Sequence, residues 1–302
     1  MTTRPPAWKV WLTAARPRTL TATLAPVLLG LAAAWGGCAR LDLVNALATL
    51  VGALGIQIGT NFFNDYADSR TGADSARRLG PPRATSLGWV TPRAMLAATA
   101  AAFLVATLAG LVLIARCGAV FFLIGLSSLI CGVWYTAGRK SLAYLGLAEP
   151  FVLVFFGPVA VAGTAYAQCG RWLPDALILG LGPGALSTIL LVLNNMRDRE
   201  GDAAAGKKTL IVRFGKHFGL GEIAGCLLVA AAAPPLAGWL SGSLAGIRPP
   251  MLLPAIFIAV AAPLALRAVH RAEGHDFNAL MARTGQMLMI YAVLSLPGLL
   301  LR

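Results

Sequence analysis

Residues 43–63 read LVNALATLVGALGIQIGTNFF, a run without a single charged side chain. A helix needs about 20 mostly apolar residues to cross the hydrocarbon core of a bilayer, so this run predicts a transmembrane helix. The end of the run overlaps with NFFNDYADSRTGAD at 61–74, which brings three aspartates in quick succession. An apolar span that ends in a cluster of acids is the feature on which the fold and the site both depend.

The composition extends this prediction to the whole chain. Of its 302 residues 58% are hydrophobic and 12% are charged, and the mean hydropathy is +0.74. A soluble domain carries about 25% charged residues, so a soluble enzyme, a disordered chain and a coiled coil are excluded. The apolar runs are continuous rather than alternating, which argues against a β-barrel. The nine predicted spans are 20–37, 43–63, 94–115, 118–136, 147–167, 174–195, 220–240, 250–267 and 282–301.

We therefore expect an all-α polytopic membrane protein, a single domain over residues 1–302. About nine transmembrane helices should surround a central cavity that opens to the cytoplasmic side. Residues 1–19 are polar and basic and lack the pattern of a cleavable signal peptide, so the first span is expected to be retained.

The lysines and arginines indicate the orientation. With the N-terminus in the cytoplasm, most of the 25 basic residues fall on cytoplasmic segments, as the positive-inside rule requires. Nine spans then leave the C-terminus outside. The net charge of +13 follows from this topology and from contact with anionic lipid head groups. Membrane lipid, and no nucleic acid, is the expected partner. The outer segments would hold only Arg40, Arg116, Arg171, Arg248 and Arg302.

The five cysteines are scattered singly through apolar or loop sequence. They form no C-x-x-C pair and none lies near a histidine at metal-ligand spacing, so we expect small apolar packing residues. They are Cys38, Cys117, Cys131, Cys169 and Cys226.

Half of the twelve acidic residues fall in two short stretches on the predicted cytoplasmic side. The first stretch follows the second span and contains Asp65, Asp68 and Asp74. If the span continues as a helix, Asn61, Asp65 and Asp68 lie at i, i+4 and i+7, and Asn64 lies four residues before Asp68. We call these four side chains the first acid column.

The second stretch, NNMRDREGDAAAGKKT, follows the sixth span. Here Asn194, Asp198 and Asp202 lie at i, i+4 and i+8 and form the second acid column. Gly72 and Gly201 are places where each helix can end.

Stacked carboxylates repel each other unless a cation joins them. Carboxylate and amide oxygens are hard ligands suited to Mg²⁺, which also prefers a site that substrate phosphates complete. Two such columns facing one cavity predict a diphosphate clamp. Nearby basic residues that could contact the phosphates are Arg139, Lys140, Lys207 and Lys208. The alternative for any single aspartate is a solvated charge or a salt-bridge partner. The other acids flank span ends, and Glu149, at the start of the fifth span, could face the cavity.

The motifs resemble those of the UbiA superfamily of intramembrane prenyltransferases, with N-D-x-x-D at 64–68 and D-x-x-x-D at 198–202. Further stretches of the sequence are similar to those of the branch of this superfamily that acts on 1,4-dihydroxy-2-naphthoate in menaquinone biosynthesis. The resemblance covers the first two-thirds of the chain. The matching pieces are RPRTL at 16–20, IQIGTNFFNDYADSRTGAD at 56–74, RLGPPR at 78–83, YLGLAEPFVLVFFG at 144–157 and NNMRDREGDAAAGKKTLIVRFG at 194–215.

This resemblance implies a site with two Mg²⁺ ions. Asn64 and Asp68 would hold one ion, and Asp198 and Asp202 the other, so that Asp65, Asp68, Asp198 and Asp202 are the expected catalytic carboxylates. Supporting or substrate-binding positions would be Asn61, Asp65, Asp74 and Asn194. Lys140 or Arg139, in the loop after Tyr135, matches a position that contacts diphosphate. Arg16 or Arg18 matches the region that receives the carboxylate of the aromatic acceptor.

The implied reaction transfers a polyprenyl group from polyprenyl diphosphate to 1,4-dihydroxy-2-naphthoate. Carbon dioxide and diphosphate are lost and demethylmenaquinone forms, at the bacterial cytoplasmic (inner) membrane. The allylic cation needs a dry pocket with apolar or aromatic walls, for which Tyr135 and several phenylalanines are candidates. Another acceptor, such as 4-hydroxybenzoate, haem, chlorophyllide or a glycerol phosphate lipid, is one alternative. A cation-coupled transporter is another, although its acids are expected at mid-span in inverted repeats.

Overall fold

The computed structural model describes residues 4–71, 79–138, 141–241 and 249–301. Within these ranges the chain is helical and forms no strand. The principal helices are α1 (Ala7–Ala15), α2 (Thr21–Cys38), α3 (Leu43–Thr71), α4 (Pro92–Cys117), α5 (Val120–Trp134), α6 (Leu142–Leu145), α7 (Ala148–Val154), α8 (Ala160–Cys169), α9 (Pro174–Arg197), α10 (Arg199–Ala204), α11 (Leu210–Ser241), α12 (Leu252–Arg271) and α13 (Asp276–Leu300).

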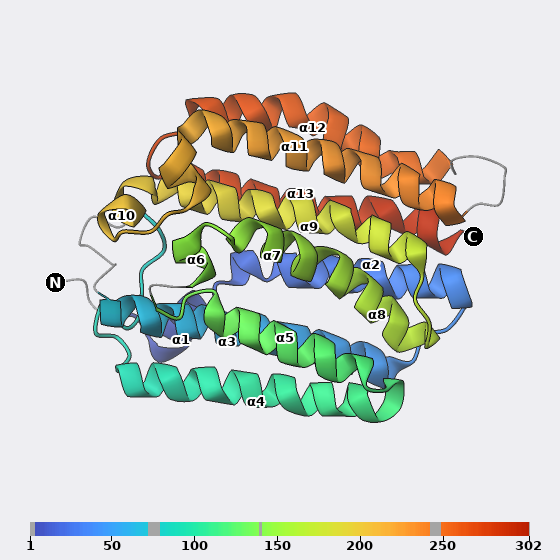
Figure 1. Ribbon diagram of the computed structural model, residues 1–302, viewed down its shortest axis with the longest axis horizontal. Helices are drawn as coiled ribbons and strands as arrows, with labels where there is room; N and C mark the ends of the chain where they lie inside the picture. Colours follow the sequence, from blue (N-terminus) through green and yellow to red (C-terminus); the bar gives the residue numbers. More distant parts are fainter. Residues whose placement is uncertain (1–3, 72–78, 139–140, 242–248, 302) are drawn as a thin grey trace.

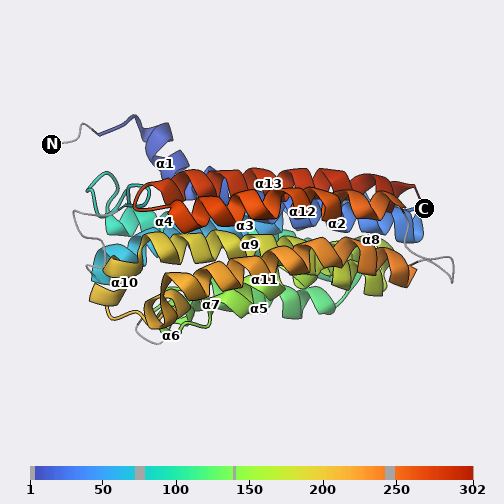
Figure 2. The same ribbon diagram turned by 90° about the horizontal axis from the view of Figure 1, so that it is seen from above.

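The long helices run roughly parallel to one another along the longest dimension of the molecule (Figure 1). The short helices α1, α6 and α10 lie at one end, which we call the motif end, because both acid columns end there (Figures 1 and 2). The chain terminates at the opposite end, and this position agrees with an odd number of passes through the bundle (Figure 1).

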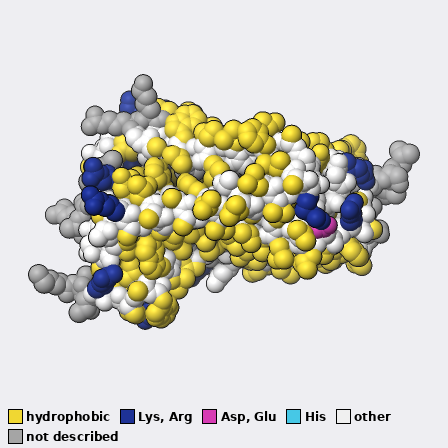
Figure 3. Space-filling view, turned by 90° about the horizontal axis from the view of Figure 1, so that it is seen from below, with side chains coloured by type: hydrophobic (Ala, Val, Ile, Leu, Met, Phe, Trp, Pro, Cys, Tyr) yellow, Lys and Arg dark blue, Asp and Glu magenta, His cyan; other side chains and the backbone are white. Residues whose placement is uncertain are grey.

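Eight helices of the described residues are long and apolar enough to cross a membrane. They account for eight of the nine predicted spans, with α7, the following turn of π-helix and α8 together forming Ala148–Cys169. The predicted fourth span is a helix of only 15 residues, α5, so its passage through the bilayer stays a prediction. A mostly apolar surface separates basic side chains at the two ends of the molecule, as expected for a bilayer-spanning bundle (Figure 3).

Helix α9 is the central helix, and most of its residues are buried inside the bundle. It packs against α7 and the π-helical segment Phe155–Val159 through glycines. A Cβ added at Gly184 would lie 2.3 Å from the carbonyl oxygen of Leu153, and one added at Gly157 would lie 2.6 Å from that of Gly180. Only glycine permits this backbone approach, which fixes the position of α7 against the part of α9 that leads to the second acid column.

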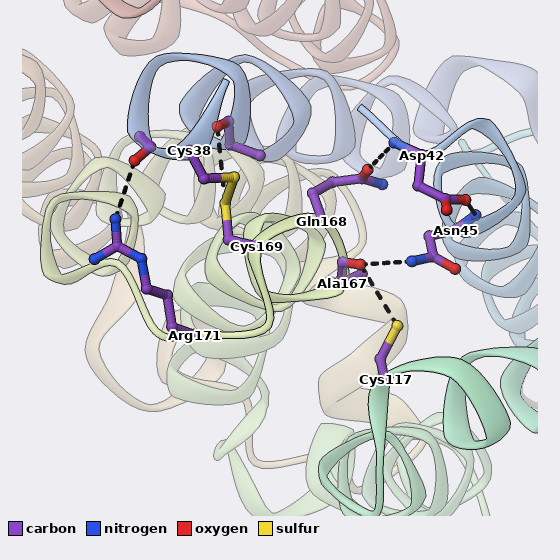
Figure 4. Close-up of a disulfide and its surroundings, with 10 residues drawn as sticks. Cys38, Asp42, Asn45, Cys117, Ala167, Gln168, Cys169 and Arg171 are labelled. Carbon is purple, nitrogen blue, oxygen red and sulfur yellow. Dashed lines mark hydrogen bonds between the residues drawn. A yellow bond between two sulfur atoms is a disulfide. The ribbon is translucent and has the colours of Figure 1, made fainter. Parts of the chain in front are cut away.

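The end opposite the motif end corrects the prediction for two cysteines. Cys38, at the end of α2, and Cys169, at the end of α8, form a disulfide rather than packing as free thiols (Figure 4). The sequence separation of 131 residues hides this pair, because the two cysteines meet only when α2 packs against α8 with the C-terminal ends of both helices at the same end of the bundle. Cys117, Cys131 and Cys226 are free.

Polar contacts surround this disulfide. The Nδ2 of Asn45 donates to the carbonyl of Ala167 at 2.7 Å, and the Nη2 of Arg116 contacts Oδ2 of Asp42 at 2.6 Å (Figure 4 shows the first contact). Hydrogen bonding to the backbone N–H of Asn45, with the nearby Arg116 guanidinium, lowers the pKa of the Asp42 carboxyl below its ordinary value. This end of the bundle is therefore held by a covalent bond and by an ionised cluster.

Candidate active site

A cavity of about 1550 Å³ begins at the motif end and extends between the helices. It brings together residues that the sequence places more than a hundred positions apart. The predicted site residues that line it are Arg16, Asn61, Asn64, Asp68, Tyr135, Asn194, Asp198, Asp202 and Lys207. Arg18, Asp65 and Lys208 do not line it, and Asp74, Arg139 and Lys140 lie outside the described residues.

The first acid column lies on a continuous helix, as predicted, because α3 extends through the motif to Thr71. The Nδ2 of Asn61 donates to the carbonyl of Ala15 at 2.9 Å and ties α3 to the end of α1. The hydroxyl of Thr136 donates to Oδ1 of Asn64, and the guanidinium of Arg83 forms an ion pair with Asp68. Asn64 and Asp68 thus present oxygen atoms to the cavity from buried positions.

Asp65 has a different environment from the one expected for a catalytic carboxylate. Its Oδ2 and Oδ1 accept hydrogen bonds from the backbone N–H groups of Ala84 and Thr85, both at 2.9 Å. The residue is 2% exposed and does not line the cavity. Asp65 therefore holds the 79–91 segment against α3, and this places Arg83 beside Asp68.

The second acid column is interrupted where the sequence predicted a continuous helix. Helix α9 ends at Arg197, and Asp198 has non-helical angles (φ −95°, ψ 8°) before α10 begins. The i to i+4 spacing survives, because the N–H of Asp198 bonds to the carbonyl of Asn194 and that of Asp202 to the carbonyl of Asp198. All three side chains still reach the cavity. Gly201 lies within α10 and does not end it; the chain turns at Gly206, where φ is +74°.

Arg197 organises this column. Its Nε and Nη2 contact Oδ1 and Oδ2 of Asp198 at 2.8 and 2.6 Å, and Nη2 also contacts Oδ1 of Asn194 at 2.7 Å. Its Nη1 donates to Oδ1 of Asn278 on α13 at 2.9 Å. The residue is 5% exposed, so a buried guanidinium sets the positions of two members of the column.

Hydrogen bonds and the short backbone stretch 79–83 together join the two columns. Asn278, which accepts from Arg197, donates through Nδ2 to the carbonyl of Leu79 at 2.9 Å. Leu79 begins the described part of the segment that carries Arg83, the partner of Asp68. We call this connection the clamp bridge: Asp68, Arg83, Leu79, Asn278, Arg197 and Asp198. It links the ends of α3 and α9 through α13.

Lys207 adds a positive charge at the second column. Its Nζ lies 2.8 Å from Oδ1 of Asp202 and 5.8 Å from the centroid of the Tyr144 ring. Burial lowers the pKa of Lys207, but the carboxylates of Asp202 and Asp68 outweigh it, and the net pKa is raised above its usual value. Lys207 thus stays positively charged at neutral pH.

The structure separates the two arginines that the sequence left as alternatives. Arg16 occupies the left-handed region (φ 54°, ψ 66°) between α1 and the next turn, and it lines the cavity. Arg18 is exposed and does not reach it. A left-handed conformation in a residue other than glycine is unusual and often marks a functional position.

The sequence analysis missed Arg83, Arg197 and Asn278. The two arginines were counted only as topology signals, although both lie in the quoted motifs RLGPPR and NNMRD. Asn278 lies in the last third of the chain, where no motif was found. No spacing rule could assign it, because its role depends on how α13 packs against α9.

The oxygen donors of the two columns fit Mg²⁺. Among the described residues no three His, Cys, Asp or Glu side chains converge closely enough to hold a metal by themselves. Mg²⁺ binds through one or two carboxylates and completes its octahedron with water and substrate phosphates, so an Asn–Asp pair and an Asp–Asp pair suit it. Zn²⁺ favours clustered nitrogen and sulfur ligands, whereas the described lining of the cavity contains no histidine and a single cysteine, Cys131.

Comparisons with known proteins show which family the chain resembles. The sequence model that describes the UbiA prenyltransferase family matches residues 23–292. A 1,4-dihydroxy-2-naphthoate octaprenyltransferase of Mycobacterium tuberculosis is 38% identical over 296 residues, and the match covers 94% of each chain. The protein of the same name from Escherichia coli is 36% identical over 214 residues, 69% of each chain.

Among solved structures, a UbiA homologue from Archaeoglobus fulgidus bound to DMAPP and Mg²⁺ has a TM-score of 0.68 at 15% identity. The alignment covers 96% of this chain and 98% of the homologue, so the two share a fold along their whole length. With the family match spanning both acid columns, the chain belongs to the UbiA prenyltransferase family.

Proposed function

We propose that this protein transfers a polyprenyl group from polyprenyl diphosphate to 1,4-dihydroxy-2-naphthoate in a Mg²⁺-dependent reaction of menaquinone biosynthesis. Carbon dioxide and diphosphate leave and demethylmenaquinone is formed. The observation that supports the proposal is that residues of both acid columns, Asn61, Asn64 and Asp68 from the first and Asn194, Asp198 and Asp202 from the second, line one cavity. The names of the M. tuberculosis and E. coli relatives support the choice of the aromatic acceptor.

Asn64 and Asp68 would hold one Mg²⁺ ion and Asp198 and Asp202 a second. Metal ions bound there would neutralise the negative charge of the leaving diphosphate. Lys207 reaches the same region and adds a positive charge to it. Arg83 and Arg197 keep the carboxylates oriented, and the clamp bridge fixes the separation between them. The ends of two helices and one connecting segment thus form a preorganised electrostatic site for the departing group.

The rest of the cavity suits an apolar chain and a reactive cation. It continues away from the columns along α3, α4 and α5, where Leu113 and Phe121 line it close to the α4–α5 connection. Nearer the columns it is lined by Tyr135, Phe151 and Phe155. Apolar and aromatic walls exclude the water that would otherwise capture an allylic cation.

Arg16 is the candidate for the carboxylate of the acceptor. A guanidinium binds a planar carboxylate through two parallel hydrogen bonds. Arg16 lines the cavity together with Tyr135, so an acceptor held there would lie beside the aromatic wall. Among the described residues, no side chain stands out as a general base.

We propose that the motif end faces the cytoplasm and that the C-terminus lies outside, in the bacterial inner membrane. The Cys38–Cys169 disulfide supports this orientation, because disulfides persist in oxidising compartments and the bond lies at the far end from the acid columns. The orientation also agrees with the distribution of Lys and Arg. The chain would act as a single domain.

Product analysis by mass spectrometry tests the proposal. Membranes containing the protein are given 1,4-dihydroxy-2-naphthoate, a prenyl diphosphate and Mg²⁺, and demethylmenaquinone is the expected product. A panel with 4-hydroxybenzoate and other acceptors, using one radiolabelled donor, would identify a different prenyltransferase. Ion flux through proteoliposomes without any prenylated product would instead favour the transporter alternative.

A further inference from the structure

Glu149 and Asn195 form a buried polar pair beside the cavity, apart from both acid columns. Glu149 lies in the first turn of α7 and is 4% exposed, and Asn195 lies on α9 and is 6% exposed. The Nδ2 of Asn195 donates to Oε1 of Glu149 at 3.0 Å. The proposed chemistry uses neither residue.

The two residues occupy different positions relative to the cavity. Asn195 lines the cavity, whereas Glu149 does not line it and contacts Asn195 from the side away from the cavity. Because a carboxylate oxygen accepts hydrogen bonds, Glu149 fixes the amide group of Asn195 with its NH₂ side turned away from the cavity. The Oδ1 of Asn195 is then left on the other side, and no described residue donates a hydrogen bond to it.

This oxygen is accessible from the cavity rather than sealed in the core, so it can accept a hydrogen bond from a ligand that carries an N–H or O–H group. The diphosphate does not meet this need, because its ionised oxygens are acceptors and would be repelled by Oδ1. A prenyl chain has no polar hydrogen at all. Of the substrates of the proposed reaction, only the phenolic hydroxyls of the aromatic acceptor can donate.

The neighbouring wall is suited to a flat ring. Phe151 and Phe155, which line the cavity, lie parallel at 3°, with centroids 6.3 Å apart. Phe151 and Tyr135 pack against the same small core as Leu191, one turn before Asn195 on α9. Aromatic side chains of this kind favour stacked or edge contacts with a planar ligand.

We infer that Asn195 binds a phenolic hydroxyl of the aromatic acceptor through Oδ1, and that Glu149 is a positioning residue that holds the Asn195 amide in the required orientation. The inference rests on the proposed function. Asn195 would then be a second polar contact for the acceptor in addition to Arg16. Asn195 and Glu149 together would determine which hydroxylated aromatic compounds are accepted.

Substrate analogues combined with variants provide the test. Steady-state rates are measured with 1,4-dihydroxy-2-naphthoate and with its two monohydroxy analogues, 1-hydroxy- and 4-hydroxy-2-naphthoate. The Asn195→Leu variant should lose about tenfold in kcat/KM for the dihydroxy acceptor, with the KM for prenyl diphosphate unchanged. It should also lose the wild-type preference for the dihydroxy acceptor over the analogue that lacks the recognised hydroxyl.

The role of Glu149 is tested by a conservative rescue. Glu149→Gln keeps an oxygen acceptor for the Asn195 amide and should retain acceptor kinetics within about twofold of wild type, whereas Glu149→Leu should reproduce the Asn195→Leu pattern. Thr188→Val, a buried substitution on the same helix away from the cavity, is the matched control and should leave the acceptor preference unchanged.

Three outcomes distinguish the possibilities. If wild-type protein makes no product from 1,4-dihydroxy-2-naphthoate, the proposed function fails. If wild-type protein is active but uses all three naphthoates equally well, or if Asn195→Leu keeps the wild-type preference, the inference about Asn195 is overturned. The wild-type comparison needs no variant, so equal use of the three naphthoates overturns the inference even if Asn195→Leu does not fold.

Discussion

The guanidinium of Arg197 contacts both carboxylate oxygens of its sequence neighbour Asp198, from Nε at 2.8 Å and from Nη2 at 2.6 Å. Adjacent residues on a regular helix point in different directions. This pairing exists because α9 ends at Arg197 and the backbone of Asp198 departs from helical angles. The break in the helix is thus what turns Asp198 towards both the arginine and the cavity.

Replacing Arg197 should impair turnover through Asp198. We expect Arg197→Ala to lower kcat about 100-fold, because an unheld carboxylate is displaced from the position that the reaction needs. Arg197→Lys should rescue little, since an ammonium cannot form the bidentate contact. Steady-state kinetics in detergent check this. Arg267→Ala, an exposed arginine on α12, is the control, and equal activity of all three variants would contradict the role of Arg197.

The acid columns predict strict metal dependence. Asp68→Ala and Asp198→Ala should each lower turnover by several orders of magnitude, because each removes a carboxylate expected to hold a metal ion. EDTA should abolish wild-type activity and added Mg²⁺ should restore it. Asp276→Asn, an exposed position at the start of α13, serves as control. Near-normal turnover of either alanine variant at matched expression would refute the two-metal assignment.

Arg16 and Arg18 should differ in their effect on the acceptor. Arg16→Lys should raise the KM for the naphthoate and leave that for prenyl diphosphate nearly unchanged, because lysine cannot reproduce two parallel hydrogen bonds to a carboxylate. Arg18→Lys should be silent, since Arg18 is exposed outside the cavity. Initial rates with each substrate varied in turn provide the measurement, and a silent Arg16→Lys would require a different residue for the carboxylate.

The disulfide predicts a thiol count and a stability change. In denatured protein without reductant a maleimide should label three cysteines, and after reduction five. The double variant Cys38→Ser, Cys169→Ser should lose about 2–4 kcal/mol of stability and melt about 5–10 °C lower. Cys226→Ser should retain the wild-type melting temperature within a few degrees. Five labelled thiols without reductant would show that the bond is absent in the cell.

The proposed orientation can be mapped with single added cysteines. In a background with Cys117, Cys131 and Cys226 replaced by serine, Ser86→Cys lies exposed at the motif end, and Ala119→Cys lies exposed at the other end. An impermeant thiol reagent added to intact cells should label Ala119→Cys and spare Ser86→Cys. The reverse pattern would place the acid columns on the outer side of the membrane.

The sequence predicted the parts of this molecule that depend on local pattern. The spans followed from runs of apolar residues, and the first acid column followed from the helix period, since α3 carries no glycine or proline between Gly59 and Thr71. The shared cavity of the two columns was also predicted, because both follow spans that end on the same side.

The remaining features depend on which helices become neighbours. The pairing of Cys38 with Cys169 and the contact of Asn278 with Arg197 each join residues more than 80 positions apart. The role of Asp65 was hidden for the same reason. Its spacing matched the acid column, but its carboxylate accepts hydrogen bonds from the backbone of the 79–91 segment. The carboxylate therefore points at that segment and not into the cavity.

The clamp bridge also orders events during synthesis of the protein. Asn278 follows both acid motifs in the chain, so each motif leaves the ribosome before the residue that connects them exists. Until α13 is inserted, Arg197 lacks its contact to that helix and the spacing of the two carboxylate sets is not fixed. We therefore expect competence to bind a diphosphate to be acquired late, when α13 has been inserted and Asn278 contacts both Arg197 and Leu79.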